Sequence, residues 1–323
     1  MNEPLLTIVV VHFNTAKLTG DCVDSLLRVL HGTALRQQFE IVIVDNRSRV
    51  EEFRQLQGHL AKHADAPVQL VRNCMNSGFG LGCMLGLNYS AGKYVAFVNS
   101  DTAFDDDCFT PLIRFMEERA DAGVVTPQHL DMEGRKTPSF RRFDSFLQRF
   151  AGDGLARILY RGIGADPKGT YTEPVVVDFV LGSFMLFRLE ALATIGGFDP
   201  SLFLYYEEMD TCLRLQKAGY KAYYHPGSSF RHVGGGSAAP SLELRMETLI
   251  SMLYIIRKNK GMLYYTAFHA LLVLQYLLKA PFKQRNRKLL WGLLTLGVPQ
   301  ACSMRARQEC NFDIVNTRQT GSR

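Results

Sequence analysis

The chain has 323 residues, of which 47% are hydrophobic and 21% are charged, with a formal net charge of +6. This length can bury the core of one large α/β domain with some residues left over. The composition is that of a globular protein, and the basic excess is too small for a nucleic-acid-binding stripe, so we expect no nucleic-acid partner.

The cysteines and the N-terminus indicate the cellular compartment. The seven cysteines are dispersed, odd in number and without a CxxC pair. This pattern predicts a reducing compartment, with no disulfide framework and no zinc site built on cysteine pairs. Residues 1–4 provide no basic region before the first apolar run, and that run is too short for a signal peptide. We therefore expect a cytoplasmic protein.

Strand and helix signals alternate from the N-terminus. Residues 5–13 form a β-branched run that ends at Asn14, and Thr15 is a candidate cap for a helix through Leu30. The alternation continues with a strand at 39–44 that ends on Asp45-Asn46, a helix at 51–63, a strand at 68–71 and a helix up to about residue 91. Such alternation predicts βαβ units and a parallel sheet.

A glycine-rich turn, residues 73–82, precedes the last of these helices. Its spacing is Gly78-x-Gly80-x-Gly82, which differs from the GxGxxG of dinucleotide-binding proteins, and it follows the third strand instead of the first. Two interpretations are open. The glycines either let a bound group approach the backbone closely or relieve crowding where a helix begins.

The strongest strand signal is the apolar run of residues 94–101, which ends on the polar tip Asn99-Ser100-Asp101. Such a run predicts an interior strand of a parallel sheet. Ligands of open α/β sheets bind beyond the carboxyl ends of the strands, so we expect Asp101 in the binding crevice. A carboxylate there can hold a divalent cation that also contacts a diphosphate. The alternative is an ordinary turn, because all three residue types favour turns.

The middle of the chain is less regular. A helix is predicted at 109–119 and a strand at 123–126, but periodicity fades between residues 127 and 172. Basic residues are scattered through this segment: Arg135, Lys136, Arg141, Arg142, Arg149, Arg157 and Arg161. We expect a functional loop or an acceptor-side insertion. Apolar order returns at 175–187 around Gly182, and a helix at 189–195 ends at Gly196-Gly197, a typical C-cap.

Three acidic residues, Glu207, Glu208 and Asp210, follow an aromatic run at the start of a predicted helix. The helix dipole favours acids at this position. Aromatic neighbours that desolvate a carboxylate can also raise its pKa to the value that a general base needs. The alternative is an ordinary acidic first turn. Further along, His232 precedes three glycines, where a loop could close, although a single histidine is more often structural.

The order of these blocks resembles an inverting glycosyltransferase of the GT-A fold, family 2, and most of all the bacterial rhamnosyltransferase-like branch. The resemblance covers residues 5–237 and rests on these blocks: IVVVHFN, IVIVDN, NSGFG, VAFVNSD, TPSFRRF, VLGSFMLFR, IGGFDPSLFLYYEEMDTCLR and RHVGGGS. It implies an α/β fold of GT-A type, with a Rossmann-like, mixed and mostly parallel sheet flanked by helices. The catalytic domain would occupy residues 1–240.

The resemblance implies a role for each matching residue. Asp45 would take the pyrimidine base of the donor, Asp101 would bind the metal, and His232 would be a further metal or diphosphate contact. Glu208 lies at the position of the catalytic base, with Glu207 and Asp210 as acceptor-side residues or alternative bases. The other residues expected at the nucleotide-sugar site are Val11, Asn14, Asn76, Gly78, Phe79, Asn99, Arg141 and Gly182.

The implied reaction is inverting transfer of a sugar to a hydroxyl of a lipid-linked or glycan acceptor in cell-surface polysaccharide synthesis. Rhamnose from dTDP-rhamnose is the expected donor, and a UDP-sugar is the other option. Mg²⁺ or Mn²⁺ at Asp101 would neutralise the leaving diphosphate while Glu208 removes a proton from the acceptor. Two departures from the family, at Val50 and Met84, leave an alternative open: a catalytically silent scaffold in a glycan-assembly complex.

The tail, residues 241–323, is predicted to be a helical extension. Helical patterns cover residues 242–256, 262–280 and 289–298, with basic residues between and after them. A spanning helix needs about 20 apolar residues, so the second pattern is borderline and the third is too short. We expect helices that lie peripherally on the cytoplasmic face of the inner membrane. The alternative is a helical subdomain packed on the catalytic core.

Overall fold

The computed structural model describes residues 3–143, 164–233, 241–296 and 303–310. Within these residues, ten strands form one mixed sheet with the order β3-β2-β1-β4-β11-β6-β12-β5, to which β7 and β9 are added beside β6 and β12. The strands are β1 (Leu6–His12), β2 (Phe39–Asp45), β3 (Val68–Arg72), β4 (Tyr94–Asn99), β5 (Thr102–Ala103), β6 (Ala122–Leu130), β7 (Lys136–Thr137), β9 (Val175–Val177), β11 (Phe184–Arg188) and β12 (Lys221–His232). A separate two-stranded sheet joins β8 (Phe140–Arg141) and β10 (Phe179–Val180).

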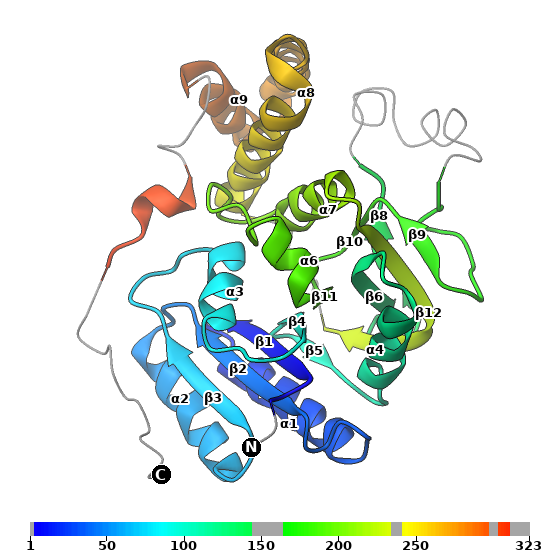
Figure 1. The fold of residues 1–323 in the computed structure, drawn as a ribbon. Coiled ribbons are helices and arrows are strands. Elements are labelled where there is room, and N and C mark those ends of the chain that lie inside the picture. The colour runs from blue at the N-terminus through cyan, green and yellow to red at the C-terminus, as the bar shows by residue number, and fades with distance from the viewer. Residues whose placement is uncertain (1–2, 144–163, 234–240, 297–302, 311–323) are drawn as a thin grey trace.

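Helices cover both faces of the large sheet, and two more helices project from one end of the molecule (Figure 1). The helices are α1 (Ala16–His31), α2 (Val50–Leu60), α3 (Phe79–Leu87), α4 (Phe109–Glu118), α6 (Leu189–Thr194), α7 (Glu207–Lys217), α8 (Leu242–Lys279) and α9 (Gln284–Leu296). Short 3₁₀ turns are η1 (Ala61–His63), η2 (Ala280–Phe282) and η4 (Met304–Arg307). The mixed, mostly parallel sheet that we predicted is confirmed.

Two apolar layers hold the sheet between its helices. Side chains alternate along β1, so Leu6, Ile8 and Val10 pack with α1, α2 and α4 on one face. Val9 lies on the opposite face with residues of α3, α6 and α7. This alternation follows from the two-residue period of a strand. It explains why the strands that are buried on both faces read as continuous apolar runs.

The strand directions bring many polar ends to one edge of the sheet. Strands β3, β2, β1 and β4 are parallel, and β11 runs antiparallel to both β4 and β6. Therefore β6, and β12 parallel to it, point in the same direction as β4. Helices α3 and α7 each precede one of these strands, so their N-termini lie at the carboxyl edge. The carboxyl edge is the edge of the sheet at which β1, β2, β4 and β12 end, together with the loops that follow these strands.

Several predicted elements have different ends in the structure. Helix α3 ends at Leu87 instead of residue 91, and β6 continues to Leu130 instead of ending at residue 126. Thr15 occupies the N-cap position of α1, but its hydroxyl accepts no capping hydrogen bond. The amide of Ala16 donates instead to Oε2 of Glu52 on α2, at 2.8 Å. The cap predicted from local sequence was wrong because a distant carboxylate satisfies the helix end.

The glycine-rich turn is explained by packing inside the protein. Gly78 has a φ of 87°, and a Cβ there would overlap the carbonyl oxygen of Phe203. That oxygen accepts a hydrogen bond from the amide of Phe79 at 3.0 Å. A Cβ at Gly82 would lie 3.1 Å from Val11. The sequence left two interpretations open, and these contacts support the one in which the glycines relieve crowding where the helix begins.

Helix α8 joins the catalytic fold to the helical tail. It is interrupted at Gly261, whose φ of 80° is not helical, so it consists of two helices in succession. The first half packs on the core through Ile255, and Ser251 donates to the carbonyl oxygen of Leu204 at 2.8 Å. The second half packs against α9, with Phe268 among the shared buried residues. The expected division at residue 240 stays a prediction.

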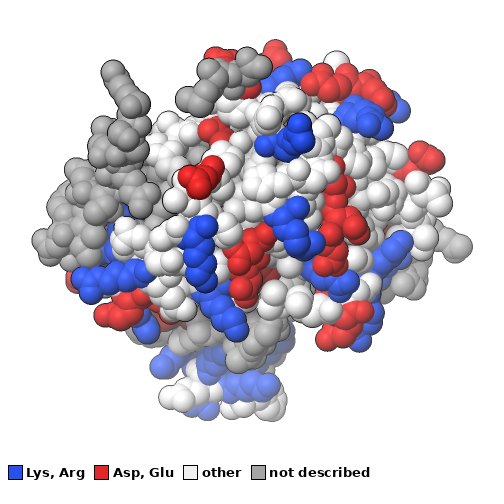
Figure 2. Space-filling view, turned by 90° about the horizontal axis from the view of Figure 1, so that it is seen from below, with Lys and Arg blue, Asp and Glu red and all other residues white. Residues whose placement is uncertain are grey.

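The charges on the described surface are mixed. In Figure 2, which views the molecule from below Figure 1, acidic and basic side chains alternate in small groups over the described residues of that face. This distribution agrees with the modest net charge of +6. The basic segment residues Arg149, Arg157 and Arg161, and the glycines after His232, lie outside the described residues.

Candidate active site

The carboxyl edge carries most of the residues that we expected at the site. Val11, Asp45 and Asn99 lie at the ends of β1, β2 and β4, and His232 is the last residue of β12. Gly182 precedes β11, which runs in the opposite direction and therefore begins at this edge. The acids Glu207 and Glu208 begin α7. Residues far apart in the sequence thus gather because the strands share one direction.

Asp101 and His232 form the best-defined pair at this edge. His232 Nε2 lies 2.9 Å from Asp101 Oδ1, and both side chains are partly exposed. The contact is fixed by the backbone, because β5 pairs antiparallel with the end of β12 and places His232 opposite Thr102. The amide of Val233 also donates to the carbonyl oxygen of Asp101 at 2.8 Å.

The spacing of this pair fits two ligands of one divalent cation. Two ligands at right angles around an ion with bonds of about 2.1 Å are about 3 Å apart, close to the distance between Asp101 Oδ1 and His232 Nε2. Such ions typically take one or two protein ligands and fill their remaining positions with water and phosphate oxygens. Asn99 Nδ2 lies 3.4 Å from His232 Nε2 and helps to orient the imidazole.

His129, on β6, is a member of this cluster that the sequence did not reveal. Its ring centroid lies 5.0 Å from that of His232, and its Nδ1 is buried without a hydrogen-bond partner. Burial lowers the pKa of His129, and the nearby His232 lowers it further. Because a neutral imidazole carries no charge, His129 would not repel a cation bound beside His232. No local motif marks His129, because its place depends on the pairing of β6 with β12.

Asp45 lies where the sequence placed it, but its carboxylate is fully buried. Oδ1 accepts from the amide of Ser48 at 3.0 Å, and Oδ2 lies 3.2 Å from Arg72 Nε in a geometry that makes no hydrogen bond. His12 Nε2 lies 3.8 Å from Oδ1 and is also unpartnered. Arg72 and His12, which the sequence analysis missed, therefore join Asp45 in a buried polar group with free donors and an acceptor.

Two predicted nucleotide contacts hold loops together in this structure. Asn76 is buried, and its Oδ1 accepts from Asn46 Nδ2 at 3.0 Å and from the amide of Gly78 at 2.9 Å. Asn14 has a φ of 56°, and its Oδ1 accepts from the amide of Arg49 at 2.9 Å. Both side chains hold the loops of the carboxyl edge in place through these hydrogen bonds. Their expected contact with a nucleotide stays a prediction.

Helix α7 begins in a strained way that fixes its acids. Tyr205 and Tyr206 both have a φ of 70°, in the left-handed region that large side chains rarely occupy. Such conformations persist where the surrounding structure enforces them, often at functional sites. Here they turn the chain sharply into α7, where the consecutive residues Glu207 and Glu208 point about 100° apart around the helix axis.

Glu208 is the acid that remains accessible. Its Oε2 is 3.9 Å from the position of a Cβ at Gly182, and the Phe79 ring is equally close to that position. A side chain at this position would lie directly against the Glu208 carboxylate, and glycine avoids that contact. Arg141 is exposed on β8, which pairs with β10 immediately before this glycine.

The other two acids have different surroundings. Glu207 is 2% exposed, and its Oε1 has no hydrogen-bond partner. Asp210 is fully buried and forms ion pairs of 2.7 Å with Arg214 Nε and with Lys258 Nζ of α8. Two cations hold the Asp210 carboxylate at the junction of α7 and α8, which makes it a poor base. The geometry favours Glu208 among the three candidates.

Burial and the nearby charge of Glu208 raise the pKa of Glu207 from 4.5 to about 8. Between these pH values the folded chain keeps a proton that the unfolded chain has lost, so Glu207 makes stability fall as pH rises. We expect Glu207→Gln to remove this loss of stability. The free energy of unfolding of the variant, relative to that of the wild type, should grow by on the order of 3 kcal/mol from pH 5 to pH 8. Urea denaturation of both chains at each pH measures the difference. A constant difference would contradict the raised pKa.

The family model described as glycosyl transferase family 2 matches residues 7–196, more than half of the chain. The chain belongs to glycosyl transferase family 2. The family predicted from the ordered motifs is thereby confirmed.

Two bacterial rhamnosyltransferases are similar in sequence to this chain. Rhamnosyltransferase WbbL of Escherichia coli K12 is 29% identical over 161 residues, which cover 46% of this chain and 58% of that protein. N-acetylglucosaminyl-diphospho-decaprenol L-rhamnosyltransferase of Mycobacterium tuberculosis H37Rv is 28% identical over 146 residues, covering 43% of this chain and 46% of that protein. The matches thus span about half the length of these relatives.

Solved structures of low sequence identity support the GT-A fold of this family 2 chain. The mannosyltransferase PcManGT from Pyrobaculum calidifontis, in complex with GDP-Man and Mn²⁺, has a TM-score of 0.56 at 16% identity, covering 94% of this chain and 74% of that one. GalNAc-T7 with UDP, GalNAc and Mn²⁺ has a TM-score of 0.56 at 17% identity, covering 78% of this chain and 48% of that one. The predicted GT-A fold is confirmed.

Proposed function

We propose that this protein transfers a sugar from a nucleotide-sugar donor to an acceptor hydroxyl, with inversion at the anomeric carbon. The observation that carries the proposal is the arrangement of the carboxyl edge. The pair Asp101–His232 lies at the ends of strands there, and the accessible carboxylate of Glu208 lies at the start of α7 at the same edge. Membership of glycosyl transferase family 2 supports the class of reaction.

Each of these residues has a distinct part in the proposed reaction. Glu208 accepts the proton of the acceptor hydroxyl as its oxygen attacks the anomeric carbon. Gly182 leaves the space in which that hydroxyl can approach Glu208. A single displacement of this kind inverts the anomeric centre and needs no covalent sugar intermediate.

Asp101 and His232 would hold the cofactor, which we propose is Mg²⁺ or Mn²⁺. A bound ion of this kind supplies positive charge that neutralises the departing diphosphate. Asn99 and His129 keep the His232 imidazole in place through their close contacts. The presence of Mn²⁺ in both solved relatives named above supports a divalent cofactor.

The base of the donor is proposed to bind at Asp45 and Arg72. Uracil and thymine present an N–H donor between two carbonyl acceptors, which matches a carboxylate acceptor beside a guanidinium donor. Arg72 Nη1 and Asp45 Oδ2 are buried without hydrogen-bond partners, so both have bonds to offer. Arg72 also lies 4.1 Å from the Phe53 ring and covers the carboxylate, so the base enters only when this guanidinium moves aside or shares the contact.

Rhamnose from dTDP-rhamnose is the proposed donor sugar, supported by the two rhamnosyltransferases among the relatives. The deciding experiment is a panel of dTDP-, UDP- and GDP-sugars, screened for nucleoside diphosphate release with and without Mn²⁺. Release from dTDP-rhamnose alone, and only with the metal, is the expected result. Turnover of UDP-sugars only would refute rhamnose, and turnover without metal would refute the cofactor.

The same panel tests the scaffold alternative that Val50 and Met84 suggested. In the structure Met84, which lies on α3, packs against Gly197. The departure at this position therefore has a role in packing. A silent scaffold would be stabilised against heat by dTDP or UDP with Mn²⁺ but would release no diphosphate from any sugar donor. Such a result would favour the scaffold over the enzyme.

We further propose that the helical tail rests on the cytoplasmic face of the membrane, beside a lipid-linked acceptor. One helix of the described chain, Leu242–Phe282, is long and apolar enough to cross a membrane, which by itself is weak evidence. The distal part of α8 and α9 bury one face against each other and expose the other. The exposed apolar side chains are Met262, Leu263, Leu274, Leu277, Leu278, Phe282, Trp291 and Leu294.

Basic side chains flank this exposed apolar face. Within the described residues, none of them forms an ion pair with an acidic side chain. They are Lys279, Lys283, Arg285, Arg287 and Lys288. Exposed apolar residues together with unpaired basic residues are typical of helices that lie in the interface of an anionic membrane.

Full-length protein is expected to sediment with phosphatidylglycerol vesicles at low salt and to be released as salt increases. Each basic residue near such a surface contributes about 1 kcal/mol. Reversal of Lys279, Lys283 and Lys288 to Glu should therefore weaken binding by at least about 10²-fold. Reversal of the exposed residues Arg36 and Lys62, away from the tail, is the control and should leave binding nearly unchanged.

The structure also sets the point at which the tail can be removed. A truncation after residue 240 would remove α8 and expose the core residues that its first half covers, so the shortened chain should end at residue 260, before the break at Gly261. We expect that chain to stay soluble in the presence of vesicles. Full-length protein that stays in the supernatant at low salt would refute membrane association and leave a plain helical subdomain.

A further inference from the structure

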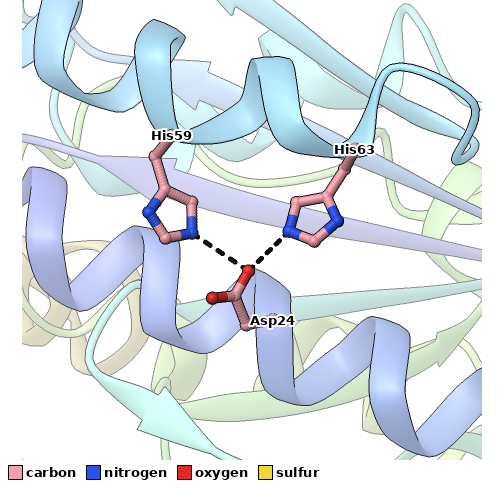
Figure 3. Close-up of side chains that lie close together, drawn as sticks. All are labelled: Asp24, His59 and His63. Atoms are coloured by element: carbon pink, nitrogen blue, oxygen red, sulfur yellow. Dashed lines mark hydrogen bonds and ion pairs between the residues drawn. The ribbon is translucent and has the colours of Figure 1, made fainter.

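A compact group of metal-binding side chains lies outside the proposed active site, between α1 and α2. It consists of Asp24 on α1, His59 on α2 and His63 in the turn η1 that follows. Figure 3 shows both imidazole rings directed at the one carboxylate. Asp24 is eight residues into α1, about 12 Å along the helix axis from its start at the carboxyl edge.

The geometry of this group is close to that of a metal site. His59 Nε2 lies 3.0 Å from Asp24 Oδ1, and His63 Nε2 lies 2.6 Å from the same oxygen. The three ligand atoms all lie within 4.8 Å of one another. Ligand atoms around a tetrahedral Zn²⁺ are about 3.3 Å apart. The longest spacing, at most 4.8 Å, reaches this value when two of the side chains each move by less than an ångström.

The two helices present these side chains in register. Asp24 follows Gly20 by one turn on α1, and His63 follows His59 by one turn, so two matched positions face each other. A Cβ at Gly20 would lie 2.9 Å from His59 Nδ1. Glycine weakens the interior of a helix, and here its missing side chain makes the space in which the His59 ring lies against α1.

Burial opposes ionisation of Asp24, but hydrogen bonds from His59 and His63 outweigh it and lower the pKa of this carboxyl. The side chains are 46%, 23% and 28% exposed for Asp24, His59 and His63, which gives an ion in solution direct access.

We propose that Asp24, His59 and His63 bind a divalent transition-metal ion, with Zn²⁺ as the preferred occupant. Two imidazoles and one carboxylate are a ligand set that Zn²⁺ accepts, with water in the fourth position. Imidazole nitrogen favours Zn²⁺ and related ions over Mg²⁺, which prefers oxygen ligands. The ion would link α1 to α2 on the outer layer, and it is separate from the cation proposed at Asp101.

Titration of the tag-free, full-length protein with Zn²⁺ tests the proposal by calorimetry and by thermal unfolding. The background is Asp101→Asn, so that the active-site pair contributes little to binding. We expect about one equivalent of Zn²⁺ to bind and to raise Tm, because the ion binds the folded chain. Co²⁺ in place of Zn²⁺ should give the visible absorption of a low-symmetry site containing nitrogen ligands.

Asp24→Asn and His63→Ala, each added to that background, should weaken Zn²⁺ binding by at least about tenfold and abolish the rise in Tm. His31→Ala removes an exposed histidine from the end of the same helix and should change neither result. Metal-free Tm values of all variants show whether each chain is folded. Equal Zn²⁺ affinity in Asp24→Asn, His63→Ala and the background protein, or no binding at all, would overturn the proposal.

Discussion

Glu208→Gln is expected to lower kcat by about 10²–10⁴-fold while the Kd for the nucleoside diphosphate stays unchanged. The amide keeps the shape of the carboxylate beside Gly182 but cannot accept a proton from the acceptor hydroxyl. Glu208 lies in the first turn of α7 and is partly exposed, so the variant should fold normally. Steady-state kinetics with a saturating acceptor, together with calorimetric binding of the nucleotide, measure both quantities.

A matched control for this variant is Glu190→Gln. Glu190 is an exposed acid in the first turn of α6, so its substitution removes the same charge from a similar position in a helix. Its kcat should be unchanged. Near-normal kcat in Glu208→Gln would contradict its role as the base and would direct attention to Glu207 or Asp210.

Asp101→Asn is expected to reduce kcat by about 10²–10³-fold, the loss typical of removing one electrostatic contact to a developing charge. The amount of Mn²⁺ needed for half-maximal activity should rise as well, since the pair with His232 loses its anionic ligand. Stability should change little, because the Asp101 side chain is 28% exposed and contributes little to the core.

Asp106→Asn serves as the control for Asp101→Asn. Asp106 is exposed five residues further along the same loop, and its substitution changes the net charge equally. We expect wild-type kcat and wild-type Mn²⁺ dependence from this chain. If Asp101→Asn showed the same Mn²⁺ dependence as Asp106→Asn, the metal site would have to lie elsewhere.

The two proposed metal sites can be separated by these variants. If both proposals hold, the pair Asp101–His232 controls turnover, whereas the group of Asp24, His59 and His63, on the outer helices, controls only zinc binding and thermal stability. Loss of activity with zinc binding intact, as expected for Asp101→Asn, distinguishes one site from the other. The reverse pattern is expected for His63→Ala.

The sequence by itself determined the succession of strands and helices. A strand such as residues 94–99 is recognised from its own side chains, because burial on both faces requires an unbroken apolar run. The polar ends Asp45, Asn99 and Asp101 were also predictable, since each follows such a run directly. A parallel sheet then places these ends at one edge, and the ordered motifs identified the family.

The tertiary structure decided what each of these polar residues contacts. Asp45 was expected to be available to a base, yet Arg72 from a neighbouring strand covers it. Asp210 could not be distinguished from Glu208 in a local acidic pattern, and the structure separates them through the ion pairs of Asp210 with Arg214 and with Lys258, which is 48 residues away on α8. His129 joins His232 because β6 and β12 are neighbours in the sheet.

The physical reason is the range over which each feature is fixed. Strand and helix periodicity depends on residues two to four positions apart, which one stretch of sequence contains. Strand order, the cap that Glu52 gives to α1, and the meeting of Asp24 with His59 depend on how distant segments pack. The sequence pattern therefore specified the elements and the edge at which their polar ends gather, and packing between elements decided which of these side chains are buried and which stay partly exposed.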